Sequence, residues 1–229
     1  MKYNLLSIFL IFWSFSGSAQ TGPDSSFSIS TRSVTRTAAL IVPAIFMSSG
    51  LLSNNNHEDG LKMEIAEERN EYIPGFHTKA DNYLQFAPIA LCYGLDALGY
   101  HGRNNVKQQT VLLLQSELIM TALVTGLKYS TKQMRPDHSK ANSFPSGHTA
   151  QAFAAASFLS LEYQSKFHWV PYVSYGIASG VGLLRMANNK HYVSDVLMGA
   201  GIGILSTRLV YWNQERIKRK HQVHSVIPM

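Results

Sequence analysis

The chain has 229 residues, of which 45% are hydrophobic, and its 20 Lys and Arg outnumber its 14 Asp and Glu to give a net charge of +6. This length suits one domain with a full core, and the single Cys92 excludes an internal disulfide or a cysteine metal cluster. The basic excess does not indicate nucleic acid binding, because four basic residues directly follow an apolar run, as at a cytoplasmic membrane flank: Arg216, Lys218, Arg219 and Lys220.

The N-terminus is typical of a secretory signal. A basic start is followed by an apolar run over residues 5–15 and by small residues that predict cleavage after Ala19. Residues 1–19 are therefore expected to be a signal peptide and residues 20–37 an exported or flanking polar segment. An uncleaved apolar N-terminus is the alternative.

Apolar stretches predict an all-α fold with a helical domain over residues 38–212 and a basic cytoplasmic tail over 213–229. The longer stretches approach the roughly 20 residues that cross a bilayer. Two observations weigh against membrane spans, namely a mean hydropathy of −0.05 and the ionisable Asp96 and Glu117, which should then face the bundle interior. There are six apolar stretches: 38–52, 83–100, 110–127, 149–161, 169–187 and 193–212.

A polar segment after the first stretch, Glu58–Glu71, is expected to form an amphipathic helix near the exported surface, with Leu61 and Ile65 at helical spacing. The topology of 38–52 stays open. A cleaved signal followed by six crossings would leave the loops after 110–127 and 169–187 in the cytoplasm. Either 38–52 does not cross, or the signal is retained.

Three cationic side chains between the later stretches match what a bound phosphate needs. A phosphoryl group spreads negative charge over its equatorial oxygens, which requires several fixed positive donors. Lys128 and Arg135 form the pattern K-x6-R-P, and we expect them two turns apart on one helix that Pro136 ends. Arg185 supplies a third cation, with a planar fork suited to phosphate oxygens.

The segment Pro145-Ser146-Gly147-His148 precedes an Ala-rich apolar run. Ser146 is expected to cap the following helix, so that the free amides of Gly147 and His148 face an anion at the positive end of the helix dipole. Taken alone, the segment fits an ordinary junction between a loop and a helix, with a capping serine, better than an anion site.

His191 and Asp195 are spaced i, i+4, which places them on one helical face. The carboxylate would accept a proton from one ring nitrogen and leave the other as a lone pair able to attack phosphorus. His148 is the natural second histidine, able to donate to the leaving alcohol and to activate water. A structural His–Asp pair is the alternative for this motif alone.

The ordered set K-x6-R-P, P-S-G-H and R-x5-H-x3-D resembles that of the type 2 phosphatidate phosphatase superfamily, which includes class A acid phosphatases and vanadium haloperoxidases. The resemblance covers roughly residues 128–195. It implies His191 as nucleophile, His148 as acid–base residue, Asp195 as orienting carboxylate, and phosphate binding by Lys128, Arg135, Ser146, Gly147 and Arg185. One position departs, since Leu184 stands where the family usually has Ser.

The resemblance further implies a six-helix membrane bundle and a lipid phosphatase that works through a phosphohistidine without metal or cofactor. Basic residues at Arg103, Lys107 and Lys166 and in the tail favour a cytoplasmic side opposite the motifs, so the expected location is the bacterial inner membrane with the active site facing the periplasm. Candidate substrates are phosphatidate, phosphatidylglycerol phosphate, undecaprenyl pyrophosphate and lipid A phosphates. Alternatives are a soluble exported acid phosphatase, a haloperoxidase and a protein that only binds lipid phosphate.

Overall fold

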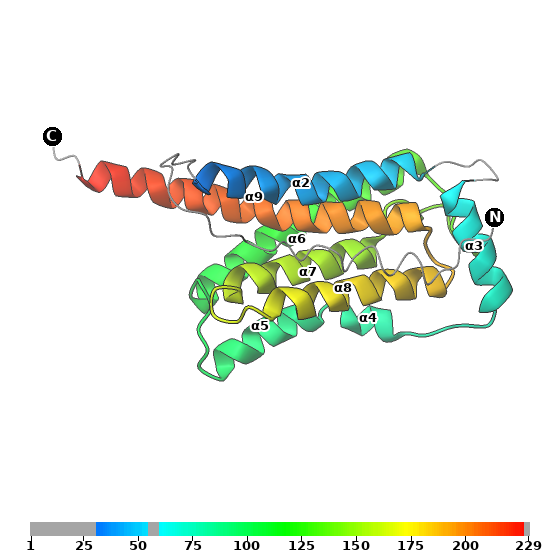
Figure 1. Ribbon diagram of the computed structural model, residues 1–229, viewed down its shortest axis with the longest axis horizontal. Coiled ribbons are helices and arrows are strands. Elements are labelled where there is room, and N and C mark those ends of the chain that lie inside the picture. Colours follow the sequence, from blue (N-terminus) through cyan, green and yellow to red (C-terminus); the bar gives the residue numbers. More distant parts are fainter. Residues whose placement is uncertain (1–30, 55–59, 227–229) are drawn as a thin grey trace, which may run out of the picture. The chain divides into compact units, whose positions relative to one another are not determined.

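The computed structural model describes residues 31–54 and 60–226, and within these ranges it contains eight helices and no strand (Figure 1). Residues 35–229 form one compact unit, and the contacts below lie within it; of residues 1–34, only the start of the first helix is described. The predicted signal peptide, residues 1–19, lies outside the described residues. The helices are α2 (Thr31–Leu52), α3 (Leu61–Tyr72), α4 (Ala80–Leu84), α5 (Ala87–Ala97), α6 (Val106–Thr131), α7 (Gly147–Tyr163), α8 (Val170–Ala187) and α9 (Val193–Val226).

Each predicted apolar stretch lies in helix, so the all-α prediction is confirmed. The stretch 83–100 is divided between α4 and α5, because Pro88 in the first turn of α5 lacks a backbone N–H and opens a new helix. The helix expected over 58–71 is α3, but its packed face is polar: Lys62 is 2% exposed whereas Leu61 is 48% exposed.

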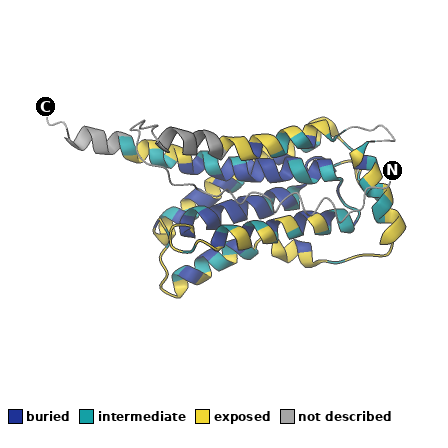
Figure 2. Ribbon diagram, in the orientation of Figure 1, coloured by how far each residue is buried: buried dark blue, intermediate teal, exposed yellow. Residues whose placement is uncertain are grey.

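Helix α7 is the centre of the bundle and contacts α5, α6, α8 and α9. Thirteen of its 17 residues are buried, so nearly all of its circumference packs against other parts of the chain (Figure 2). Its alanines have small side chains, and α9 packs glycines against them. A Cβ on Gly203 would lie 2.3 Å from the carbonyl oxygen of Ala150 and 2.8 Å from the nitrogen of Ala154, so the two backbones meet directly.

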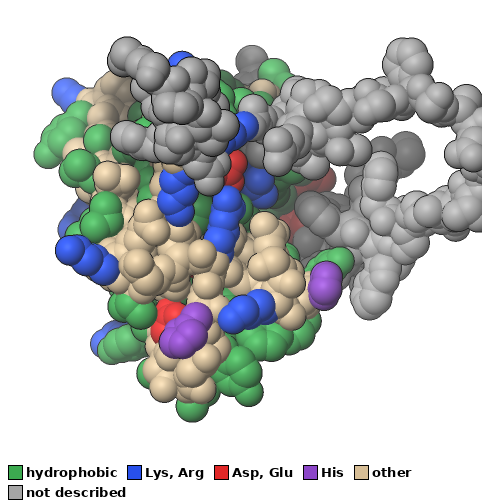
Figure 3. Space-filling view, turned by 90° about the vertical axis from the view of Figure 1, so that its left-hand side faces the viewer, with side chains coloured by type: hydrophobic (Ala, Val, Ile, Leu, Met, Phe, Trp, Pro, Cys, Tyr) green, Lys and Arg blue, Asp and Glu red, His purple; other side chains and the backbone are tan. Residues whose placement is uncertain are grey.

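The α5–α6 connection and the C-terminal part of α9, which carry basic residues, lie at the same end of the bundle. The guanidinium of Arg103 lies 2.8 Å from Glu215 of α9, and Lys218 donates to the side chain of Asn104 at 3.1 Å. Figure 3 looks onto this end, where Lys and Arg side chains are spread over the surface. The α6–α7 and α8–α9 connections lie at the opposite end (Figure 1).

Two described helices are long and apolar enough to cross a membrane by length and composition, Val106–Thr131 and Val193–Arg219. Most of the second is buried in the bundle, whereas α6 exposes large apolar side chains, with Leu114 63% and Leu118 72% exposed. Glu117 on the same helix is turned inward and accepts a hydrogen bond from Gln151 of α7 at 2.7 Å, as predicted for an ionisable group in a span. An apolar outer face with its polar group turned inward favours lipid around α6.

We predict that Gly203→Ala destabilises the protein by about 1–3 kcal/mol, because the new methyl group overlaps the α7 backbone and one helix must shift. Gly180→Ala is the matched control, since apart from its own stretch of helix no described atom lies within 4 Å of the added Cβ, and Ala favours helix over Gly by about 1 kcal/mol. Thermal denaturation of the purified variants measures the difference. Equal melting temperatures for Gly203→Ala and wild type would contradict close backbone packing.

Candidate functional site

The site lies where α7 and α9 begin and α6 and α8 end, and it gathers residues from all three predicted motifs. Asp195, in the first turn of α9, joins the P-S-G-H motif to the R-x5-H-x3-D motif. Its main-chain oxygen accepts from the nitrogen of Ser146 at 2.9 Å. Its side chain is fully buried and accepts from the hydroxyl of Ser143, from the nitrogen of Tyr192 at 2.9 Å and from His191. One carboxylate therefore joins the α6–α7 and α8–α9 connections.

His191 meets Asp195 as its spacing predicts, with Nδ1 3.3 Å from Oδ2. An ionised carboxylate only accepts hydrogen bonds, so the ring proton belongs on Nδ1 and the lone pair on Nε2. Burial lowers the pKa of His191 to about 4, against the opposing effect of Asp195, and Arg185 and Lys128 contribute to the lowering. The ring is therefore neutral at pH 7, which a nucleophile requires.

Lys128 and Arg135 both donate hydrogen bonds to Asn142. Lys128 Nζ donates to the main-chain oxygen of Asn142 at 2.5 Å, and Arg135 Nε donates to its side-chain oxygen at 2.9 Å. The expectation that both cations lie on one helix is wrong. Helix α6 ends at Thr131, and Lys132 adopts a left-handed conformation with φ of 46°, so Arg135 lies in the following loop. The loop folds back, so that Arg135 and Lys128 both reach Asn142 although they do not share a helix.

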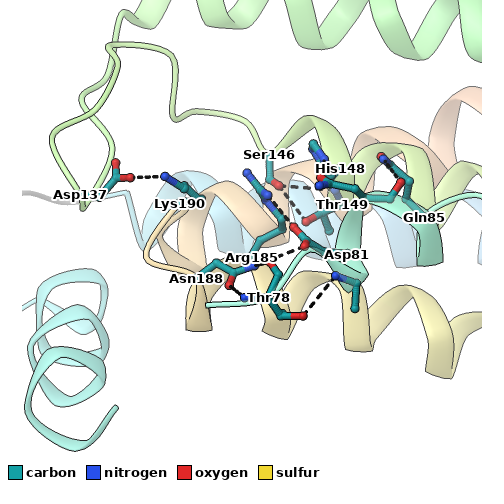
Figure 4. Close-up of polar contacts among 12 residues, drawn as sticks. Thr78, Asp81, Gln85, Asp137, Ser146, His148, Thr149, Arg185, Asn188 and Lys190 are labelled. Atoms are coloured by element: carbon teal, nitrogen blue, oxygen red, sulfur yellow. Dashed lines mark hydrogen bonds and ion pairs between the residues drawn. The ribbon is translucent and has the colours of Figure 1, made fainter. Parts of the chain in front are cut away.

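Arg185, near the end of α8, is 7% exposed and forms an ion pair of 2.5 Å between Nη1 and Asp81 of α4 (Figure 4). Its Nε is buried and has no hydrogen-bond partner among the described residues. Burial lowers the pKa of Arg135, and the nearby Arg185 lowers it further. The cations thus lie close enough to repel one another, and a buried donor remains available for an anion.

Helix α7 begins as predicted. Ser146 caps it, and its oxygen accepts from the Thr149 nitrogen at 3.4 Å and from the Thr149 hydroxyl at 2.8 Å. Both lone pairs of the Ser146 hydroxyl are then used, and its own hydrogen is left to donate. Lys128 Cε lies 4.0 Å from the position of a Cβ on Gly147, so the first amides of α7 lie beside this cation.

His148, in the first turn of α7, has Nε2 2.8 Å from the side-chain oxygen of Asn82 on α4. Burial lowers its pKa to about 4, with a further contribution from Arg185 that Asp81 partly offsets. Burial and the neighbouring cations therefore keep this ring neutral at pH 7. A bound dianion would shield it from the cations and raise its pKa.

The two connections that carry the motifs are also tied at the surface. Lys190 and Asp137 form an ion pair of 2.5 Å (Figure 4). Burial raises the pKa of Asp137, but hydrogen bonds from Lys190 and Ser139 outweigh this effect and hold it at about 2.

Helix α3 covers His191 from another side, with Lys62 Nζ 4.4 Å above the centre of the Tyr192 ring. Within the described ranges no group of three or more His, Cys, Asp or Glu could hold a metal ion.

Comparison with known proteins matches residues 109–219 to the family model described as the PAP2 superfamily. A lipid A 1-phosphatase of Porphyromonas gingivalis is 43% identical over 158 residues, which cover 68% of this chain and 35% of that protein. The chain belongs to the PAP2 superfamily. It spans only about a third of the length of this relative.

Two solved PAP2-like structures share the fold. The crystal structure of Aquifex aeolicus LpxE aligns with 25% identity and a TM-score of 0.51, covering 68% of this chain and 98% of that one. The transmembrane PAP2 type phosphatidylglycerolphosphate phosphatase of Bacillus subtilis aligns with 22% identity and a TM-score of 0.58, covering 80% of this chain and 98% of that one.

Four site residues were not anticipated from the sequence of this PAP2 chain. Asn142 and Ser143 lie close to the P-S-G-H motif but have no fixed spacing that signals their contacts. Asp81 and Asn82 lie far upstream, outside the matched range 109–219, and only the packing of α4 against α7 and α8 brings them to the site. Leu184, in the position usually held by Ser, is partly buried at the end of α8.

We predict that the unliganded protein loses stability as the pH falls from about 6.5 to about 4. His148 and His191 have folded pKa values of about 4, below the ordinary 6.5, so in this window the unfolded chain binds protons that the folded chain does not. His148→Asn should flatten the fall in melting temperature, whereas the exposed His168→Asn should leave it unchanged. An unaltered slope for His148→Asn would contradict the assignment.

Proposed function

We propose that this protein is a membrane-embedded phosphatase that removes phosphate from a lipid through a phosphohistidine intermediate. The observation that carries the proposal is a neutral His191, oriented by buried Asp195, beside three converging cations and the N-terminus of α7. A site that only bound phosphate would need the cations but not a nucleophile with its orienting carboxylate.

In the proposed first step, Nε2 of His191 attacks phosphorus and the bond from phosphorus to the leaving alcohol oxygen breaks. The Nδ1 proton stays hydrogen-bonded to Asp195, which stabilises the positive ring of the phosphohistidine. Lys128, Arg135 and Arg185 act as phosphate-binding residues together with the hydroxyl of Ser146 and the amide of Gly147. These donors are fixed before the reaction, so they stabilise the developing charge without rearrangement.

His148 is the proposed acid–base residue. Binding of the dianion raises its pKa, so that it becomes protonated and can give this proton to the leaving oxygen. The neutral ring then takes a proton from water, the water oxygen attacks phosphorus, and the bond from phosphorus to His191 breaks. The products are the dephosphorylated alcohol and inorganic phosphate. His191 is then neutral again, and His148 releases its proton to solvent when the phosphate leaves.

The substrate class follows from the surroundings of the site and from the relatives. The apolar outer face of α6 favours a bilayer around the bundle, and basic residues gather at the end opposite the site. This distribution supports the bacterial inner membrane with the active site on the periplasmic side. The relative named as a lipid A 1-phosphatase makes a lipid A phosphate the first candidate, ahead of phosphatidylglycerol phosphate, phosphatidate and undecaprenyl pyrophosphate.

We predict that His191→Ala lowers kcat at least 10³-fold on every substrate, because the site then lacks the oriented imidazole that takes up the phosphoryl group. The measurement is phosphate release by purified protein in detergent, with exposed His168→Ala as the control. Near wild-type turnover by His191→Ala would refute the proposed nucleophile.

A substrate panel tests the lipid assignment. Lipid A, phosphatidate, phosphatidylglycerol phosphate and undecaprenyl pyrophosphate are compared with p-nitrophenyl phosphate by their kcat/KM. We expect a lipid to exceed p-nitrophenyl phosphate by at least tenfold. A preference for the soluble ester, together with release of the protein by osmotic shock without detergent, would instead identify an exported acid phosphatase.

We also predict that the activity is unchanged by a chelator. Three cationic side chains and the amides of α7 already supply the positive charge that a metal would bring to the phosphoryl group. Phosphate release is measured before and after prolonged treatment with EDTA. A loss that added Mg²⁺ or Zn²⁺ restores would refute this mechanism.

A further inference from the structure

Helix α4 brings a buried carboxylate into a site that is built for an anion. Asp81 is 1% exposed, and its Oδ2 lies 2.5 Å from Nη1 of Arg185. Its other oxygen, Oδ1, accepts from Asn188 at 3.3 Å. A negative charge at this place opposes phosphate binding by simple electrostatics, so its presence requires an explanation in terms of geometry.

The geometry of the guanidinium provides that explanation. Nη1 lies on the same side as Cδ, so Nε and Nη2 form the opposite edge, whose two parallel N–H groups suit two oxygens of one anion. Asp81 engages Nη1 and leaves this edge unoccupied by its carboxylate. Nε of Arg185 is buried without a partner among the described residues, which is costly unless a ligand supplies the acceptor.

The position of α4 is itself fixed by the end of α8. The side chain of Asn188 accepts from the nitrogen of Thr78 at 2.8 Å and donates to its oxygen at 2.9 Å. This pair of bonds anchors the chain three residues before Asp81 (Figure 4). The next residue, Asn82, contacts His148 at 2.8 Å, so α4 reaches two of the proposed reactive groups at once.

We propose that Asp81 is a positioning residue that turns the Nε–Nη2 edge of Arg185 toward the phosphoryl group. The inference rests on the proposed phosphatase function and extends the active site to α4, outside the residues matched by the family. Arg185 has a long side chain with many rotamers, and fixing it before the substrate arrives lowers the entropy lost on reaching the transition state. Asp81 acts through Arg185 and does not touch substrate.

The test is a double-mutant cycle on p-nitrophenyl phosphate with Asp81→Ala, Arg185→Ala and the double variant. Asp81→Ala should lower kcat/KM by about 10- to 100-fold, as expected when a catalytic group is misplaced by about 1 Å. In the Arg185→Ala background the same change should have less than a threefold effect. Asp81→Asn should recover part of the activity, since its amide oxygen can still accept from Nη1. Tyr83→Ala, on the exposed face of α4, should stay within twofold of wild type.

Orthovanadate binding, measured by calorimetry on the same variants, separates the positioning role from the catalytic proposal. Orthovanadate should bind Asp81→Ala more weakly than wild type, with the same non-additivity toward Arg185→Ala. If wild type binds orthovanadate but releases no phosphate from any ester, the phosphatase proposal fails, while the orthovanadate affinities of the same four proteins still test the role of Asp81.

Three outcomes would overturn the positioning role. The first is that the effects of the two substitutions multiply. The second is that Asp81→Ala leaves kinetics and binding unchanged. The third is that Asp81→Asn and Asp81→Ala both have such low melting temperatures that they are inactive only because they unfold. Absence of orthovanadate binding to the wild type would refute the anion site and the role of Asp81 together.

Discussion

The carboxylate of Asp195 is the interaction on which the rest of the site depends. It is fully buried, and it receives hydrogen bonds from a ring nitrogen, a hydroxyl and a main-chain nitrogen, while its own carbonyl binds the start of α7. All three side-chain hydrogen bonds reach Oδ2, and a buried charge needs such donors to be stable. The same contacts that stabilise Asp195 therefore fix the orientation of His191 and the position of Ser146 relative to it.

The second constraint is the mutual repulsion of the cations that surround this pair. Lys128 and Arg185 lie near the ends of α6 and α8, and Arg135 lies in the α6–α7 connection. Asn142 and Asp81 hold these cations in place through contacts of 2.5 to 2.9 Å. Their field and the surrounding burial keep both histidines neutral. A dianion relieves the repulsion, so we expect ligand binding to stabilise this end of the bundle and to change the proton affinity of His148.

The bundle makes this arrangement possible by close helix packing. Small residues along α7 and glycines on α9 let the two backbones meet. The starts of these helices therefore lie side by side, with the nitrogen of Ser146 2.9 Å from the main-chain oxygen of Asp195. Short helices α3 and α4 cover the resulting site from two sides. Arg103 and Lys218 lie at the far end of the bundle, where they bind Glu215 and Asn104, and are thus separate from the cations of the site.

The sequence by itself determined the helical class, the position of nearly every helix and the residues of three motifs, because apolar periodicity, helix caps and i, i+4 spacing are local properties. It wrongly placed Arg135 on the same helix as Lys128, because the left-handed residue that ends α6 is Lys132 and not the glycine that usually marks such a position. Only the tertiary structure decided that Asn142, Ser143 and Asp81 belong to the site. Their contacts join residues 7 to 104 positions apart, and such pairs are selected by the packing of whole helices, which no short pattern in the chain records.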